Sequence, residues 1–550
     1  MARDPSKPVG TAIGDATSAV LDEAHVGDIH GAFGSIGQHD VGARHSWRAR
    51  LLTLLAIMGP GLIVMVGDND AGGVSTYAQA GQNFGLSLLW TLPLLIPVLV
   101  VNQEMVVRLG AVTGVGHARL INERFGRFWG AFSVGDLFVL NFLTIATEFI
   151  GVSLSLGYLG VSQYISVPVA AIVLVLMTAT GSFRRWERFM FVFIAANFLV
   201  IPLAIMRHPS IGPIVHGFLT PGVKGGFDST SVLLIMAIVG TTVAPWQLFF
   251  QQSNIVDKRI TPRWINYERA DTVLGSFITV FAASILIVVV ATAFKSTPLV
   301  GHFQNGATVA AGLRRYVNPT AGALFAIILL NASVIGAASV TLATSYAFGD
   351  MFGAKHSLHR SWRDAKFFYG MFSAMVILAA GIVIIPGAPL GLITTSVQAL
   401  AGVLLPSATV FLLLLCNDRE VLGPWVNRLW LNVVASIIVG VLLMMSLVLM
   451  MTTMFPTIDV RVVALVLGAL FAVTLLVALV VLFLRRGHRE PISEEMLRSR
   501  ANWRMPPVNL LQRPTWAKGT LAGMYLLRGY LVVAVIMLVV KAIELGVHHH

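Results

Sequence analysis

The residues best suited to do chemistry in this chain are the consecutive polar residues Asp68, Asn69 and Asp70, which two glycines follow closely. They separate two apolar helix patterns. A charge at membrane depth is costly, and irregular backbone persists there only where protein buries it or where it lines a wet cavity. A broken helix with carboxylates at the break therefore predicts an ion site near the middle of a membrane. The alternative is a long loop after a short hydrophobic anchor.

The composition indicates a polytopic membrane protein. Of 550 residues, 56% are hydrophobic and 12% are charged, whereas soluble domains carry about 25% charged residues. The net charge of +12 comes from basic residues in short loops between apolar runs, which is typical of the positive-inside rule and not of a nucleic-acid surface. The single cysteine, Cys416, excludes an intramolecular disulfide and a thiolate metal cluster.

Twelve or thirteen apolar runs are long enough to cross a bilayer. Every second loop between them is basic, which predicts a cytoplasmic N-terminus in a bacterial-type inner (plasma) membrane. The predicted runs are 51–82, 86–107, 129–157, 164–182, 188–206, 230–256, 270–294, 319–348, 367–385, 391–415, 429–454, 461–484 and, as a thirteenth, 521–541.

The same pattern predicts how the chain is divided. We expect a flexible cytoplasmic tail, a transport core made of two repeats, two additional helices, a basic cytoplasmic loop and a further transmembrane helix. In that order, the segments are 1–43, 44–415 (repeats 51–206 and 229–415), 416–484, 485–518 and 519–547.

A second break lies in the sixth run, where Gly240 and Pro245 interrupt an apolar helix. Proline removes a backbone hydrogen bond and frees carbonyl groups. Taken alone, this break fits an ordinary proline kink equally well. However, the first and sixth runs occupy corresponding places in two halves, and paired interrupted segments indicate an inverted-repeat transporter. The predicted fold is all-α, with a leucine-transporter-type 5+5 repeat and two or three extra C-terminal helices.

Several motifs in this order resemble the Nramp family of divalent-metal transporters, from about Leu55 to the eleventh run. No single motif would be sufficient. The matching segments are Gly59-Pro60-Gly61 with Asp70-Ala71-Gly72-Gly73, then Arg108-Leu109-Gly110-Ala111-Val112-Thr113-Gly114, and Cys416-Asn417-Asp418-Arg419-Glu420-Val421-Leu422-Gly423 with Val426-Asn427-Arg428.

The resemblance implies where the metal ligands lie and where this chain departs from the family. The family's aspartate and helix-ten glutamine match Asp70 and Gln398, but Gly73 stands at the asparagine position and Ala244 at the methionine position. This pattern is similar to that of the Nramp-related magnesium transporters, a divergent branch of the family.

The family positions associated with protons are also changed. Trp246 stands at the histidine position, and the acidic pair of the third helix matches Glu148 and Gly151, so one acid is missing. Glu148 is therefore the remaining candidate for a proton pathway, with a buried ion pair as the alternative. Trp246 is interpreted as packing that closes the family's proton route.

The chemistry of the replacements favours hard ions. Loss of a thioether at Ala244 removes a soft ligand, whereas carboxylates, carbonyls and water suit Mg²⁺ and Mn²⁺. Gly73 removes an oxygen ligand and is expected to free volume for a largely hydrated ion, since Mg²⁺ gives up its water reluctantly. The expected ligands are carboxylate and amide groups: Asp70, Asp68, Asn69 and Gln398.

Each of these assignments has a structural alternative. Asp70 could cap the following helix, Asp68 could point away from the ion, and Gln398 could satisfy freed carbonyls. Glu104, Arg108 and Asp271, at predicted helix ends, are interpreted as structural or gating pairs, not as ligands.

The favoured function is import of Mg²⁺ and Mn²⁺ by alternating access, without obligatory proton coupling. The alternatives are a proton-coupled Mn²⁺/Fe²⁺ importer, a sodium-coupled organic-solute carrier of the same fold, and a metal sensor that only binds. Asp68 beside Asp70 would repel a carboxylate substrate. The sequence contains no nucleophile motif, phosphate loop or dinucleotide fingerprint, so neither an enzyme nor a cofactor is predicted. The predicted partners are divalent ions and the bilayer.

Overall fold

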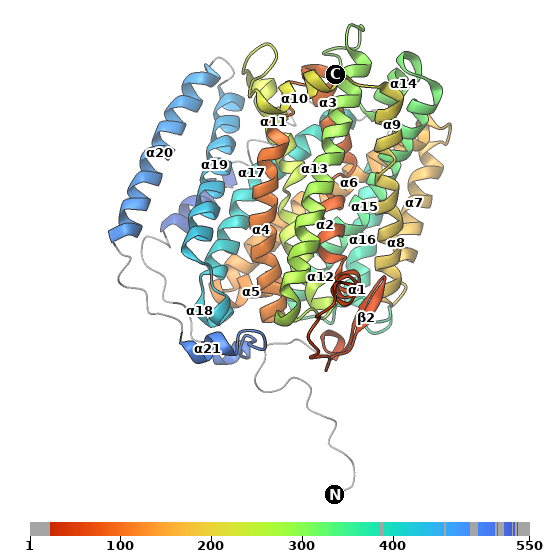
Figure 1. The fold of residues 1–550 in the computed structure, drawn as a ribbon. Helices are drawn as coiled ribbons and strands as arrows, with labels where there is room; N and C mark the ends of the chain where they lie inside the picture. The colour runs from red at the N-terminus through yellow and green to blue at the C-terminus, as the bar shows by residue number, and fades with distance from the viewer. Residues whose placement is uncertain are drawn as a thin grey trace, which may run out of the picture.

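The structure, a computed structural model, is a bundle of long helices that run roughly side by side (Figure 1). In the described part of the chain, the strands β1 and β2 form a two-stranded antiparallel hairpin. The structure describes residues 23–385, 390–455, 458–484, 493–511, 514, 522–530, 532–533 and 536.

The first predicted repeat begins with a run of apolar residues that is broken twice. One bend of 55° separates α1 from α2, and the polar residues 68–70 separate α2 from α3. The helices of this half are α1 (Trp47–Ile57), α2 (Pro60–Gly67), α3 (Ala71–Phe84), α4 (Thr91–Thr113), α5 (His117–Phe125), α6 (Arg127–Tyr158), α7 (Gln163–Thr178), α8 (Phe183–Asn197) and α9 (Val200–Arg207).

The second half has the second break, between α11 and α12, and α10 (Ile211–Leu219) precedes it. Pro245 is the first residue of α12. The N–H group at the first position of a helix has no partner within the helix, so a proline there costs no hydrogen bond. The helices of this half are α11 (Ser229–Thr242), α12 (Pro245–Asp257), α13 (Ile265–Phe294), α14 (Gly306–Tyr316), α15 (Pro319–Phe352), α16 (Lys366–Val383) and α17 (Leu390–Cys416); η2 (Pro262–Trp264) precedes α13.

The C-terminal elements lie beside this core. They are α18 (Arg419–Leu422), η3 (Gly423–Trp425), α19 (Leu429–Met454), α20 (Val460–Leu484), α21 (Glu494–Arg498) and η5 (Val508–Leu510). Each of the first twelve predicted runs coincides with one or more of the helices. Of the predicted thirteenth, residues 522–530 are helical and most of the remainder lies outside the described residues.

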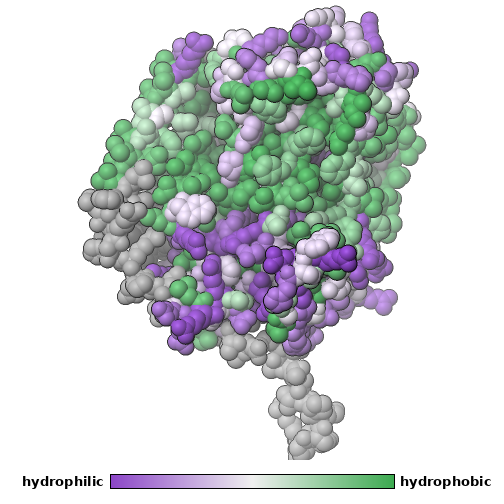
Figure 2. Space-filling view, in the orientation of Figure 1, coloured by the Kyte–Doolittle hydropathy of each residue, from purple (hydrophilic) through white to green (hydrophobic). Residues whose placement is uncertain are grey.

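Ten helices of the described part are long and apolar enough to cross a membrane, or up to eleven with the bent pair α1–α2; α7 is apolar but shorter. Their outward side chains form a hydrophobic belt with hydrophilic residues toward both ends (Figure 2). Large apolar side chains are exposed along α7, α16 and α20, such as Ile172, Ile377 and Leu465. Soluble monomers rarely expose such continuous patches, so the prediction of an all-α polytopic membrane protein agrees with this surface.

The N-terminal segment differs from the expected flexible tail. Residues 1–22 lie outside the described residues, but 23–43 contain structure: η1 (Glu23–His25) and the hairpin of β1 (Ile29–Gly31) with β2 (Gly34–Ile36). Ile29 and Ile36 are buried, and β1 and β2 contact α1 and α8. Burial of the two isoleucines offsets the entropy lost when the segment becomes ordered. The polar composition of residues 1–43 did not indicate this order.

Candidate metal site

The two helix breaks face each other inside the bundle. α11 packs against α3, and α12 packs against α2. The Thr241 hydroxyl donates to the carbonyl oxygen of Asp68 at 3.4 Å, and the hydroxyls of Tyr77 and Thr242 lie 2.8 Å apart. The expected meeting of the first and sixth runs is therefore present. Tyr77 also contacts the second break, through Thr242, and was not predicted to do so, because a tyrosine in a helix is not distinctive in sequence.

Asp68 ends α2 and is fully buried. Neither of its carboxylate oxygens has a hydrogen-bond partner among the described residues. The neighbouring Asn69 donates its amide to the Thr279 carbonyl at 3.1 Å, while its Oδ1 has no partner among them. Because an unpaired buried charge is very costly, these free oxygens favour a bound cation. Asp68 is thus buried at the first break, next to the second one.

Asp70 is the N-cap of α3, as the structural alternative for this residue proposed. Its Oδ1 accepts a hydrogen bond from the Gly73 N–H at 2.6 Å. Glu148 of α6 accepts from the Ala71 N–H at 3.0 Å, and it lies beside Asp70, because a Cβ added at Gly336 would be 2.5 Å from the Glu148 Oε2 and 2.8 Å from the Asp70 Cβ. A carboxylate has acceptor capacity beyond one cap bond, so capping and metal binding by Asp70 are compatible.

Gln398 of α17 lies against the first turn of α3. A Cβ added at Gly72 would be 1.7 Å from the Gln398 Nε2, so the glycine is what lets this amide approach. That Nε2 has no hydrogen-bond partner among the described residues. The Gln398 amide therefore lies at the first break, as predicted. Rotation about its last side-chain bond would turn the amide oxygen, in place of the nitrogen, toward the break.

The two glycine replacements do not open space in this conformation. A Cβ at Gly73 would lie 2.7 Å from the Asp68 carbonyl oxygen and 2.9 Å from the Thr241 Oγ1. At Gly151 it would lie 2.3 Å from the Ser333 Oγ. The expectation that Gly73 frees volume is wrong here, because the backbone of the first break and a threonine of α11 occupy that volume.

Ala244 and Trp246 flank the start of α12, and both are buried. Ala244 is the N-cap residue of α12 and makes no side-chain cap bond. The Trp246 ring lies against the end of α2, 3.2 Å from a Cβ placed at Gly67, and its centroid is 5.8 Å from that of Phe250. The Trp246 ring therefore packs between the end of α2 and Phe250, in agreement with a packing role.

A second set of buried charges anchors the start of α2, at the end of the bundle that carries the hairpin. Asp271 of α13 accepts hydrogen bonds from the N–H groups of Gly59, Gly61 and Leu62 at 2.8–3.1 Å. A carboxylate at a helix N-terminus is favoured by the helix dipole. Its interpretation as a structural group agrees with these contacts.

Lys258 directly follows α12, beside the basic residues Arg259 and Arg263, but its side chain is fully buried. Its Nζ donates to the carbonyls of Ile57 and Met58 and lies 2.6 Å from Glu187. These contacts join the end of α12 to the α1–α2 bend and to α8. No local sequence signal distinguishes Lys258 from its basic neighbours, because the partners come from distant segments.

A family model described as Nramp, natural resistance-associated macrophage protein-like, matches residues 61–452. The divalent metal cation transporter MntH of Xylella fastidiosa is 27% identical over 457 residues, covering 79% of this chain and 91% of that protein. MntH of Bacillus subtilis is 25% identical over 421 residues, covering 73% and 93%.

Among solved structures, the Eremococcus coleocola manganese transporter in complex with an aromatic bis-isothiourea compound aligns with a TM-score of 0.58. It is 18% identical, and the alignment covers 80% of this chain and 97% of that one. A likeness at this identity concerns the fold alone. It confirms the predicted all-α transporter fold.

Proposed function

Because the chain belongs to the Nramp family, as its motifs predicted, we propose that it imports divalent metal ions, with Mg²⁺ and Mn²⁺ as substrates. The relatives are named divalent metal cation transporters, and none of those described above is an enzyme. The metal is the transported substrate and not a cofactor. The proposed location is a bacterial inner membrane with the N-terminus in the cytoplasm, which rests on the basic loops.

One observation carries this proposal: Asp68, fully buried where the two helix breaks meet, has two carboxylate oxygens without partners among the described residues. Asp70 lies two residues away at the start of α3. A buried carboxylate without a hydrogen bond is stabilised by a cation. The broken helices supply further oxygens, because carbonyl groups freed at a break can coordinate an ion.

The donors at the breaks are oxygens and amides, which favours hard ions. No group of three or more His, Cys, Asp or Glu residues suited to a metal occurs in the described part of the chain. The one thioether on α2, that of Met65, accepts a hydrogen bond from the Ser276 hydroxyl at 3.6 Å. Mg²⁺ binds through one or two carboxylates while keeping water, and Mn²⁺ uses similar oxygen ligands.

The first prediction concerns selectivity. In proteoliposomes, the wild-type protein should take up Mg²⁺ and Mn²⁺ with comparable, modest affinity and should not prefer Cd²⁺. Ala244→Met would place a soft sulfur at the second break, and the apparent affinity for Cd²⁺ should rise about tenfold, or about 1.4 kcal/mol, with little change for Mg²⁺.

Ala270→Met is the matched control, because Ala270 is exposed on α13, away from the breaks. This variant should behave as wild type toward every ion. Wild-type uptake in which Cd²⁺ or Fe²⁺ is bound far more tightly than Mg²⁺ would contradict a site made of hard donors.

The proposed import needs no obligatory proton. A divalent cation gains about 4.6 kcal/mol per 100 mV of inside-negative potential, twice the value for a single charge. Trp246 and Gly151 cannot titrate. The remaining acid, Glu148, has its carboxyl in contact with the Ala71 N–H, Thr147 and Asp70, of which only Asp70 titrates. These contacts support a local role and do not supply a relay across the membrane.

The proximity of Glu148 to Asp70 favours a second candidate, a proton-coupled importer of Mn²⁺ or Fe²⁺. Two buried carboxyl groups that lie close together repel each other when both are charged, which favours a proton on one of them. A metal ion bound by Asp70 would compete with that proton. This candidate differs from the first in whether the displaced proton accompanies the ion across the membrane.

The second prediction separates the two. Vesicles containing a pH-sensitive dye are held at a fixed potential, and Mn²⁺ or Mg²⁺ is added outside. Uncoupled transport predicts uptake without internal acidification beyond that of protein-free vesicles, and Glu148→Gln should keep the ratio of protons to metal at zero. Acidification that scales with metal uptake and vanishes in Glu148→Gln would establish the coupled mechanism instead.

A further inference from the structure

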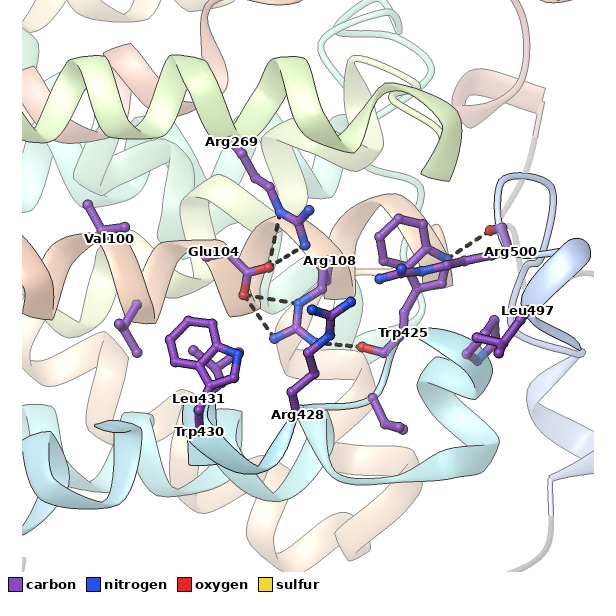
Figure 3. A pocket seen from close by; sticks show the side chains of 13 residues that line it. Val100, Glu104, Arg108, Arg269, Trp425, Arg428, Trp430, Leu431, Leu497 and Arg500 are labelled. Carbon is purple, nitrogen blue, oxygen red and sulfur yellow. Dashed lines mark hydrogen bonds and ion pairs between the residues drawn. The ribbon is translucent and has the colours of Figure 1, made fainter. Parts of the chain in front are cut away.

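A cavity of about 430 Å³ lies outside the transport site, at the end of the bundle that carries α18 and α21. Four segments that are distant in sequence form it: α4, α13, the η3–α19 connection and the α21 segment. Figure 3 shows Glu104 between Arg269 and Arg108, with Trp430 and Leu431 of α19 nearby. The lining residues are Val100, Val101, Glu104, Arg108, Arg269, Pro424, Trp425, Val426, Arg428, Trp430, Leu431, Leu497 and Arg500.

The pocket holds four guanidinium groups and a single carboxylate, an excess of three positive charges. Glu104 pairs with two of them, Arg108 at 2.9 Å and Arg269 at 2.5 Å. Arg108 also donates to the Trp425 carbonyl at 2.5 Å and to Asn427 Oδ1 at 2.6 Å. Protein groups therefore already bind Arg108 and Arg269, and these two side chains form one wall of the pocket.

The other two arginines, Arg428 and Arg500, make no side-chain hydrogen bond or ion pair with the described residues. Arg500 lies over the Trp425 ring, with its Cζ 3.9 Å from the centroid, and its buried Nε has no partner among those residues. Burial, together with repulsion from Arg269, Arg428 and Arg108, holds the pKa of Arg500 below its usual value. An anion in the pocket would relieve this repulsion.

The walls of the pocket are apolar and reach the lipid-facing surface. Val100, Val101, Leu431 and Leu497 line it, and Trp430, in the first turn of α19, is 60% exposed. Tryptophan at the end of a transmembrane helix is typical of the membrane interface. Figure 2 shows the hydrophobic belt giving way to hydrophilic side chains toward this end of the molecule. The arginines thus lie at the depth of lipid head groups, next to apolar side chains that face the hydrophobic belt.

We propose that this pocket binds an anionic phospholipid. Arg428 and Arg500 hold the phosphodiester, against the wall formed by Arg108, Arg269 and Glu104. The acyl chains run along the apolar side chains of α4 and α19, past Val100 and Trp430. Basic pockets between transmembrane helices on the basic side of a membrane protein bind such head groups, and guanidinium groups match phosphate oxygens in geometry. A soluble anion would leave the apolar walls unused.

Bound lipid would connect the helices of the two predicted repeats with elements outside them. The pocket joins α4 and α13, which pack around α2, α3 and α12, to α19 and the α21 segment outside the repeats. Arg428 and Arg500 make no contact with Asp68 or Asp70 at the breaks. Their substitution therefore tests lipid binding without altering the metal site.

The test is native mass spectrometry of the purified full chain in detergent, titrated with dioleoyl phosphatidylglycerol or with dioleoyl phosphatidylcholine, which has the same acyl chains. We expect one phosphatidylglycerol to bind more tightly than phosphatidylcholine. Arg428→Gln with Arg500→Gln should weaken that binding at least tenfold. Arg498→Gln is the matched control, because the Arg498 side chain is 83% exposed on the same segment and pairs with Glu494, and this variant should bind the lipid as wild type does.

Two results would overturn the proposal: equal binding of phosphatidylglycerol by the double variant and the wild type, or displacement of the lipid by millimolar inorganic phosphate, which would identify a small-anion site. If the double variant loses its thermal unfolding transition, Arg428→Gln alone replaces it. Arg428 is exposed, so the protein is expected to fold without it. Equal binding of phosphatidylglycerol by Arg428→Gln and the wild type would then overturn the proposal.

Discussion

Asp70→Ala is expected to abolish saturable Mn²⁺ and Mg²⁺ uptake in proteoliposomes while the protein remains folded. The variant removes one of the two aspartates of the first break and leaves Asp68 as the other. Loss of the cap bond to the Gly73 N–H should cost only about 1 kcal/mol of stability. Binding of a divalent ion depends far more strongly on the number of carboxylate ligands. The measurement is initial uptake rate against ion concentration.

A second variant separates the capping role of Asp70 from its role as a ligand. Asn is as good an N-cap as Asp, so Asp70→Asn keeps the bond to Gly73 and the start of α3. It removes the negative charge, and uptake should still be lost. Asp364→Asn, at an exposed acid in the loop before α16, should transport as wild type. Wild-type uptake by Asp70→Asn would show that Asp70 is a structural cap and that the ion lies elsewhere.

Lys258→Met is expected to destabilise the fold by about 3–5 kcal/mol, the cost of removing one partner of a buried ion pair. Glu187 would then remain buried with the backbone N–H of Ala32 as its partner at 2.5 Å. The carbonyls of Ile57 and Met58 would also lose their shared donor. Unfolding free energies measured in mixed detergent micelles report this directly.

The double variant Lys258→Met with Glu187→Gln should recover part of the loss, because no unpaired charge remains buried. Lys366→Met, at an exposed lysine in the first turn of α16, should change stability by no more than about 0.5 kcal/mol. If Lys258→Met were as mild as Lys366→Met, the buried contacts of Lys258 would not be holding the α1–α2 bend to α12.

Much of the fold could be read from local sequence. The first twelve apolar runs predicted helical segments that the structure shows, because a chain in a membrane must satisfy its backbone hydrogen bonds within each segment. The two breaks were predicted at 68–70 and near Pro245, since proline and consecutive polar residues end a helix through their own backbone and side-chain chemistry. The hairpin over residues 29–36 was missed, because its order depends on the surfaces of α1 and α8 and not on its own composition.

The types of residue at the site were also set by sequence, whereas their roles depended on contacts between distant segments. Only the packed bundle shows that the Asp68 oxygens lack partners among the described residues while Asp70 caps α3. The packing likewise fills the space at Gly73 with the Thr241 side chain, buries Lys258, and brings Arg428 and Arg500 into one pocket. Helix breaks follow from neighbouring residues, whereas burial, pairing and free volume arise where segments some two hundred residues apart in sequence come together, as Lys258 and Ile57 do.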